Sequence, residues 1–216
     1  RSDMDCFVPL LEKFHETYGF YPQYPVADAG YGSYNNYIYC EQHGMKKYMK
    51  FTMFKKETTD KKYRDNPFRA VNFKIDEEGT LRCPAGKAFH FQYRRNVKGN
   101  QYGRQEEIYQ CEDCTECPYA AQCKKTDKKR TIQLNHELTS MHQEVVENLE
   151  SIHGALLRMN RSIQSEGTFG ILKNNRWYKR IVRKGMEQVR LEIFLVSIGY
   201  NLYKYYNKTL RIKKAA

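Results

Sequence analysis

The sequence contains no long hydrophobic run and only one tryptophan among its 216 residues. Its best apolar run, residues 193–196, is ended by Ser197, far short of the roughly 20 apolar residues that cross a bilayer. A membrane-spanning protein is therefore excluded, and the mean hydropathy of −0.83 agrees. The sequence also opens without an apolar signal segment, so we expect a cytoplasmic protein. It contains neither a Walker A loop nor a dinucleotide-binding fingerprint.

Acidic residues are outnumbered by basic ones. The chain has 37 Lys and Arg against 25 Asp and Glu, which gives a formal net charge of +12. A charge of this size attracts polyanions, and nucleic acid is the commonest such partner. Residues 173–216 hold twelve of the basic residues and only two acidic ones, Glu187 and Glu192. We therefore expect salt-sensitive DNA binding by this segment, with the two glutamates as surface or ion-pair residues of a helix.

Seven cysteines are present, and four of them lie close together in the sequence. An odd number with a tight cluster favours a metal site in a reducing compartment over a disulfide framework. Four thiolates would form a tetrahedral Zn²⁺ site that stabilises a small β-rich segment. Free buried thiols and an iron–sulfur cluster are the alternatives. Zinc is the prediction, held by four of the five residues Cys83, Cys111, Cys114, Cys117 and Cys123.

Hydrophobic periodicity predicts a mixed α/β architecture for the first sixty residues. Residues 7–18 carry apolar side chains at helical spacing and end at Gly19. A short apolar strand follows and places Asp28 at its carboxyl end, before a glycine-rich turn. Residues 35–41 are expected to form a helix and residues 46–54 a second strand, which is an α/β pattern.

The character of the sequence changes twice along the rest of the chain. From residue 60 to about residue 129 it is polar, with strands predicted at residues 70–75, 89–94 and 106–110. Helical periodicity returns at residues 138–157, 163–173 and 185–206. We therefore divide the chain into a first core part (residues 1–58), a β-rich insertion that holds the cysteines (59–130) and a helical second core part with a basic tail (131–216).

Two acidic residues stand in surroundings that suit chemistry. A side chain at the carboxyl end of a parallel strand, such as Asp28, points toward the crevice where α/β folds place active sites. The alternative is that Asp28 only caps the turn that follows it. Glu166 lies on a predicted helix, seven residues before Lys173 and so on the same face, although a glutamate on an exposed helix is usually just a solvated charge.

Four segments together resemble the DDE transposases of bacterial insertion sequences, and they occur in that family's order. The resemblance extends over nearly the whole chain and includes a cysteine-bearing insertion between the second Asp and the Glu, as in one subgroup. The segments are residues 26–33 (VADAGYGS), residues 166–173 (EGTFGILK), the cluster Arg180, Arg183 and Gly185, and residues 201–204 (NLYK).

The resemblance implies a ribonuclease H-like core, interrupted by the β-rich insertion, whose Asp, Asp and Glu hold two Mg²⁺ or Mn²⁺ ions. Hard cations of this kind prefer carboxylate oxygens, and two of them can activate the attacking oxygen and stabilise the leaving one. Asp28 matches the second Asp and Glu166 the Glu. Asp3 and Asp5 do not match the first Asp, so we expect it upstream of this chain and expect the chain to be the C-terminal part of a longer transposase.

The same resemblance implies double-stranded DNA as partner, at transposon ends and target, and a homo-oligomer during synapsis. Lys173 matches the family's Lys, whereas Arg161 is one position away from the family's Arg. Lysine would contact a phosphate as a point charge and arginine through a two-pronged fork. A non-catalytic, zinc-containing nucleic-acid-binding module is the competing hypothesis. The predicted DNA contacts are Arg161, Lys173, Arg176, Lys179, Arg180, Arg183 and Lys184.

Overall fold

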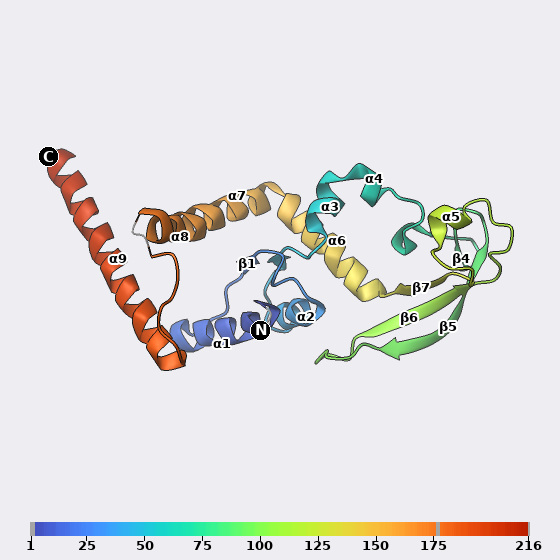
Figure 1. Ribbon diagram of the computed structural model, residues 1–216, viewed down its shortest axis with the longest axis horizontal. Coiled ribbons are helices and arrows are strands. Elements are labelled where there is room, and N and C mark those ends of the chain that lie inside the picture. Colours follow the sequence, from blue (N-terminus) through green and yellow to red (C-terminus); the bar gives the residue numbers. More distant parts are fainter. Residues whose placement is uncertain (1–2, 176–177, 216) are drawn as a thin grey trace. The chain divides into compact units, whose positions relative to one another are not determined.

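A computed structural model describes residues 3–175 and 178–215 of the chain (Figure 1). The chain divides into two compact units, Arg1–Leu157 and Arg158–Ala216, each of which is described by itself. In the described part of the chain, no helix combines the length and the apolar character needed to cross a membrane.

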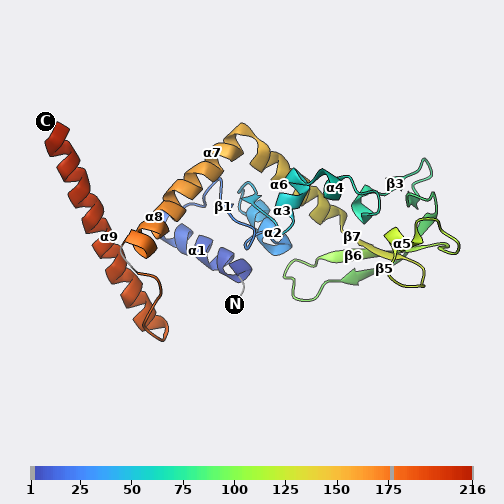
Figure 2. The same ribbon diagram turned by 45° about the horizontal axis from the view of Figure 1, so that its top comes forward.

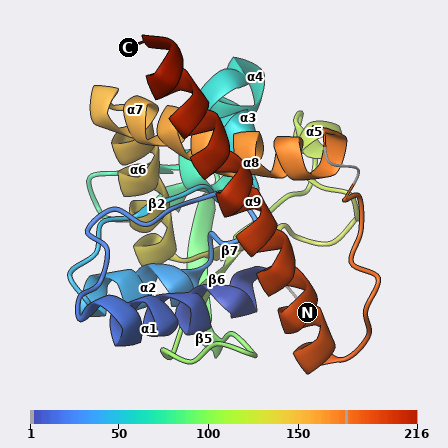
Figure 3. The ribbon, with the colours of Figure 1, turned by 90° about the vertical axis from the view of Figure 1, so that its left-hand side faces the viewer.

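The first unit begins with alternating helices and strands. A 3-10 turn, η1 (Asp3–Cys6), leads into helix α1 (Phe7–Tyr18), strand β1 (Val26–Ala27), helix α2 (Tyr34–Gln42) and strand β2 (Tyr48–Met49). The two strands pair in parallel. Helices α1 and α2 lie side by side, as Figure 3 shows. The α/β pattern predicted for this segment is therefore observed.

The core of this part of the unit is rich in tyrosine. Tyr37 and Met49 are completely buried, and the hydroxyl of Tyr37 donates to the carbonyl oxygen of Met49 at 3.0 Å. Helix α6 (His136–Glu150) closes the core with Met141, Val145 and Leu149, three residues at helical spacing. Residues about a hundred positions apart in the sequence thus share one apolar cluster.

A five-stranded antiparallel sheet forms the second half of the first unit, with its strands in sequence order. Strands β5 and β6 form the long hairpin in Figure 2. The sheet has its own small core, which includes Phe89 and Ile132. The strands are β3 (Lys74–Ile75), β4 (Leu81–Arg82), β5 (Ala88–Asn96), β6 (Gln105–Cys111) and β7 (Thr131–Leu134); helix α5 (Ala120–Cys123) lies between the last two.

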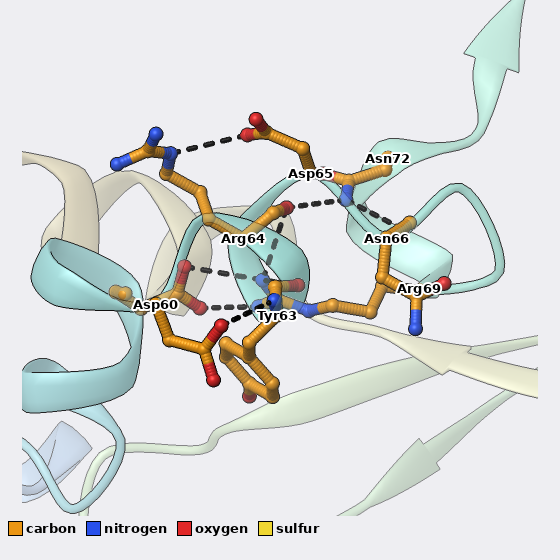
Figure 4. Close-up of polar contacts among 8 residues, drawn as sticks. Asp60, Tyr63, Arg64, Asp65, Asn66, Arg69 and Asn72 are labelled. Carbon is orange, nitrogen blue, oxygen red and sulfur yellow. Dashed lines mark hydrogen bonds and ion pairs between the residues drawn. The ribbon is translucent and has the colours of Figure 1, made fainter.

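Two short helices and a 3-10 turn connect the two halves, α3 (Phe54–Thr59), α4 (Lys61–Arg64) and η2 (Ala70–Asn72). Asp60 caps α4 by accepting a hydrogen bond from the Tyr63 N–H at 3.0 Å. Asn72 donates its amide to the carbonyl oxygens of Arg64 and Asn66 (Figure 4). These polar contacts hold a segment that buries few apolar side chains.

The second unit is helical. After α7 (Ile152–Arg161), which begins in the first unit, come a π-helical turn η3 (Ser162–Glu166), α8 (Gly167–Gly170) and a second π-helical turn η4 (Ile171–Asn175). Residues 178–185 form neither helix nor strand, and the long helix α9 (Met186–Ala215) follows them. The hydroxyl of Tyr200 on α9 lies 3.5 Å from that of Thr168 on α8.

Several predicted elements are confirmed. The helix predicted at residues 7–18 is α1, and the one predicted at residues 35–41 lies within α2. The strands predicted at residues 89–94 and 106–110 lie within β5 and β6. The ribonuclease H-like core itself stays a prediction, as does the division at residues 58 and 130.

Three predicted elements are wrong in extent. Only Tyr48–Met49 of residues 46–54 is a strand, because the chain then turns: the Phe54 N–H donates to the Phe51 carbonyl oxygen at 2.9 Å, and α3 begins at Phe54. Residues 70–75 start with a 3-10 turn and contribute only Lys74–Ile75 to the sheet. The helix predicted at residues 138–157 breaks at Ser151, whose hydroxyl oxygen accepts the Gly154 N–H at 3.0 Å and starts α7.

Candidate active site

Asp28 directly follows strand β1, as predicted. Its Oδ1 accepts a hydrogen bond from the Gly30 N–H at 3.3 Å, and its carbonyl oxygen accepts one from the Tyr31 N–H at 3.2 Å. The carboxylate therefore does shape the turn, which was the alternative interpretation from the sequence. A carboxylate carries two oxygens with several acceptor positions, so capping and metal binding are compatible roles for this side chain.

The turn after Asp28 is held close to strand β2. A Cβ atom on Gly32 would lie 2.0 Å from the carbonyl oxygen of Lys50, so only glycine fits there. Ser33 then caps α2 by accepting the Asn36 N–H at 3.3 Å. Gly32 thus serves close backbone approach, and the turn is fixed at both ends.

Asp3, which does not match the family's first Asp in the sequence, places a second carboxylate at the same turn. A Cβ atom on Gly30 would be 3.0 Å from Asp3 Oδ2 and 3.5 Å from Asp28 Oδ1. Asn36 ties the two segments together, because its amide donates to the carbonyl oxygens of Met4 and Tyr31. No local pattern could have revealed that these two segments lie together, since helix α1 separates them in the sequence.

Glu166 ends the π-helical turn η3 in the second unit. Its carboxylate accepts a hydrogen bond from the Ser162 hydroxyl at 3.1 Å and pairs with the Arg161 guanidinium at 3.7 Å. The Glu166 side chain is 67% exposed, whereas that of Arg161 is 29% exposed. Arg161, predicted as a phosphate contact, is thus positioned beside the predicted catalytic carboxylate.

The helical path around Glu166 is unusual. Two π-helical turns, η3 and η4, flank the four-residue helix α8. π-helical turns are rare and occur frequently at functional sites. Lys173 lies within η4, with its ammonium group 5.8 Å from the centre of the Phe169 ring. The predicted pair Glu166 and Lys173 therefore falls on a widened helix instead of a regular one.

The basic residues after η4 form an exposed loop. Lys179, Arg180, Arg183 and Lys184 are all exposed. Arg176, which was also predicted to contact DNA, lies outside the described residues. Gly185, at φ = 83°, turns the chain into α9. Glu192 of α9 is half-buried and accepts backbone hydrogen bonds from this loop, a role that the sequence did not indicate.

The five predicted zinc ligands lie in the region of the antiparallel sheet, in two different settings. Cys83, Cys111 and Cys114 pack against the apolar core of the sheet. Burial, together with a hydrogen bond with Cys114, raises the pKa of the Cys111 thiol to about 12. Cys123 contacts Arg130 instead, whose Nη1 lies 2.7 Å from its Sγ. Cys117 lines an open surface hollow.

These contacts do not assemble the zinc site that the spacing predicts. Among the residues that the structure describes, no group of three or more His, Cys, Asp or Glu side chains is arranged to hold a metal ion. Arg130 is the bridge between the two sets, because its backbone N–H also lies 3.5 Å from Cys114 Sγ. Donors of this kind suit thiolates, but the zinc site stays a prediction.

A comparison with protein-family models finds one match that covers more than half of the chain. Residues 82–206 match the model described as the transposase DDE domain. The chain belongs to this transposase family. The resemblance drawn from the sequence motifs is thereby confirmed. Comparisons with curated proteins and with solved structures give no match.

The matched segment of the transposase includes Glu166, Lys173 and the basic loop, while Asp28 precedes it. Transposase DDE domains act on DNA and in general use divalent metal ions. Exposed carboxylate oxygens such as those of Glu166 suit Mg²⁺ or Mn²⁺. Asp28 and Glu166 belong to different units, so their meeting at one metal centre stays a prediction.

Proposed function

We propose that this transposase catalyses metal-dependent phosphodiester hydrolysis and strand transfer at transposon ends, with Asp28 and Glu166 as ligands of the divalent ions. The observation that supports this most is the setting of Glu166: an exposed carboxylate on a π-helical turn, beside Arg161, inside the matched segment. Two divalent ions would supply activation of the attacking oxygen and stabilisation of the leaving oxygen.

The residues of the chain would divide the remaining work. Glu166 now has Arg161 as counter-ion and Ser162 as hydrogen-bond donor, and both hold its carboxylate in place before a cation arrives. Glu166 would hold a divalent ion through its carboxylate, and the Arg161 guanidinium beside it would bind a phosphate through its fork. Lys173 and the exposed loop residues Lys179, Arg180, Arg183 and Lys184 would hold the DNA backbone as point charges and forks.

The first carboxylate of the triad stays a prediction outside this chain, and Asp3 is the alternative that the structure offers at the Asp28 turn. The two assignments differ in one measurable respect. If Asp3 is a ligand, Asp3→Asn should weaken Mn²⁺ binding about as much as Asp28→Asn does. If the missing Asp is upstream, Asp3→Asn should leave Mn²⁺ binding unchanged, and a longer chain should cut DNA far faster.

The test of the proposal combines Mn²⁺ binding by calorimetry with nicking of transposon-end DNA. Asp28→Asn and Glu166→Gln should each abolish cation binding by this chain, and nicking by a chain extended upstream to the first Asp, while the circular dichroism spectrum stays unchanged. Glu187→Gln is the matched control, because it removes one exposed carboxylate from the start of α9. Cation binding that survives both Asp28→Asn and Glu166→Gln would contradict the proposal.

A non-catalytic nucleic-acid-binding module is the second candidate, and the exposed basic loop supports it, because such a surface binds DNA without any chemistry. Such a module would bind DNA equally with Mg²⁺ or EDTA and would not nick it.

Zinc is tested separately by metal analysis of the purified protein. About one equivalent of zinc, lost in Cys111→Ser and Cys114→Ser, is expected; stoichiometric iron or no metal would contradict the zinc prediction.

A further inference from the structure

The basic loop, residues 178–184, folds back along the start of α9. Gly185 reverses the chain, and its carbonyl oxygen accepts the Val189 N–H at 3.0 Å in the first turns of the helix. At the other end, the Tyr178 N–H donates to the carbonyl oxygen of Leu172 at 3.1 Å. Between these ends, the loop donates hydrogen bonds to the side chain of Glu192.

Both oxygens of the Glu192 carboxylate take part. Oε1 accepts the Tyr178 hydroxyl at 2.7 Å and the Val182 N–H at 3.0 Å. Oε2 accepts the Arg183 N–H at 2.8 Å and is 3.3 Å from the Val182 nitrogen. Two successive backbone N–H groups that point at one anion form a small anion-binding nest. A carboxylate is the side chain that can accept all of these bonds at once.

The hydrogen bonds to Glu192 also compensate the positive charge of the loop. The loop carries four exposed cationic side chains on a short backbone, and their mutual repulsion favours an extended, variable chain. An anion bound beneath the backbone of that loop offsets this repulsion and fixes which way the chain turns. The hydrogen bonds that the Val182 N–H, the Arg183 N–H and the Tyr178 hydroxyl donate also lower the pKa of Glu192, so its carboxylate is ionised at neutral pH.

We propose that Glu192 is a positioning residue that fixes residues 178–184 in one conformation and thereby presents Lys179, Arg180, Arg183 and Lys184 together to the DNA backbone. The inference rests on the DNA contact proposed above for these four side chains and adds the residue that arranges them. Glu192 itself does not touch DNA, because its two oxygens are occupied by the loop.

The decisive experiment asks whether removing the negative charge of Glu192 strengthens or weakens DNA binding. Glu192→Gln and Glu187→Gln each raise the net charge by one, on the same helix. If only charge mattered, both variants would bind DNA more tightly. Because glutamine keeps one acceptor oxygen and turns an N–H₂ group toward backbone donors, Glu192→Gln should instead weaken binding, roughly 3- to 10-fold.

The measurement is binding of the full chain to a mixed-sequence DNA duplex, over a salt range of about 50 to 200 mM. Glu192→Gln should also flatten the salt dependence, by about one unit of slope for each phosphate that the loop no longer neutralises. Tyr178→Phe removes one donor without any change of charge and should give a smaller decrease in affinity. Hydrogen exchange at the Val182 and Arg183 amides should become roughly tenfold faster or more in Glu192→Gln, while α9 keeps its protection.

A variant with glutamine at positions 179, 180, 183 and 184 separates this inference from the proposed function. If that variant loses DNA affinity and Glu192→Gln binds as tightly as Glu187→Gln does, the positioning role is wrong and the DNA contact stands. If the four-position variant binds DNA like the unchanged protein, the DNA role of the loop is wrong, and the positioning role falls with it.

Discussion

The Lys47 ammonium group lies 2.5 Å from the Glu144 carboxylate, 97 positions later in the chain, and 2.5 Å from that of Glu41. The Lys47 side chain is only 4% exposed, whereas both glutamates remain close to half exposed. One buried cation therefore joins the end of α2 to helix α6, although the whole antiparallel sheet separates them in the sequence. The free-energy cost of burying this charge is compensated only while both carboxylates are ionised and accept its hydrogen bonds.

Lys47→Met should lower the free energy of unfolding by about 1–3 kcal/mol, because two charge-assisted hydrogen bonds disappear and two carboxylates are left facing each other. Although burial lowers the pKa of Lys47, its hydrogen bonds to Glu144 and Glu41 raise it overall. The contribution is thus complete at neutral pH and is lost only as the pH rises beyond the ordinary lysine value of about 10.4. Urea unfolding measures it, with exposed Lys46→Met as the near-neutral control.

The stability of the first unit should fall in mild acid because of His142. This ring stacks on Phe51 at 4.0 Å, and burial lowers its pKa to about 4, with smaller effects of Glu57 and Arg104 that oppose each other. Between about pH 6.5 and 4, the unfolded chain binds a proton at this residue that the folded chain does not, so stability falls as the pH falls. Urea midpoints at about pH 4.5, 5.5 and 7 test this.

The matched variant for that prediction is His142→Phe, which keeps an aromatic ring against Phe51 and cannot titrate. Its urea midpoint should depend less steeply on pH in this window than that of the unchanged protein. His136→Gln removes an exposed histidine and should leave the slope as it was. An equal slope in His142→Phe and in the unchanged protein would show that other groups control the acid sensitivity.

Gly32→Ala should distort the Asp28 turn. The new Cβ would lie 2.0 Å from the Lys50 carbonyl oxygen, so backbone must move, at a cost of about 1–3 kcal/mol. Metal-dependent nicking should fall more than stability alone explains, because the displaced segment carries Asp28. Gly199→Ala on α9 meets open space and should stabilise by up to about 1 kcal/mol. Thermal unfolding of both variants reveals the opposite signs.

Arg69→Lys should destabilise the segment between the two halves of the first unit by about 1–2 kcal/mol. The Arg69 guanidinium forms a two-pronged pair with Glu57, donates to the Tyr63 carbonyl oxygen and lies 4.1 Å from the Tyr63 ring. Lysine keeps the charge but cannot reproduce the fork. Arg64→Lys, at a half-exposed pair with Asp65, should change stability by less than about 0.5 kcal/mol. Equal losses of stability in both variants would contradict this account.

Local patterns were sufficient to predict the amphipathic elements, in which one continuous segment buries one of its faces. Residues 7–18 repeat apolar side chains at helical spacing and end at a glycine, so the helix and its left-handed cap follow from the sequence. Asp28 after its strand and the family motifs were likewise readable, because each is a contiguous string. The shorter strands were less predictable, since residues 47–49 are buried one after another and do not alternate.

Composition and short motifs were enough to identify the family, the basic C-terminal segment and the candidate metal-binding carboxylates. Each of these features is a run of neighbouring residues in the sequence. Which partner each charged side chain contacts is set only by the tertiary structure. Lys47 with Glu144 and the basic loop with Glu192 are pairings between residues that no local period relates. They arise because burial and backbone donors select partners by their position in the fold, whatever the separation along the sequence.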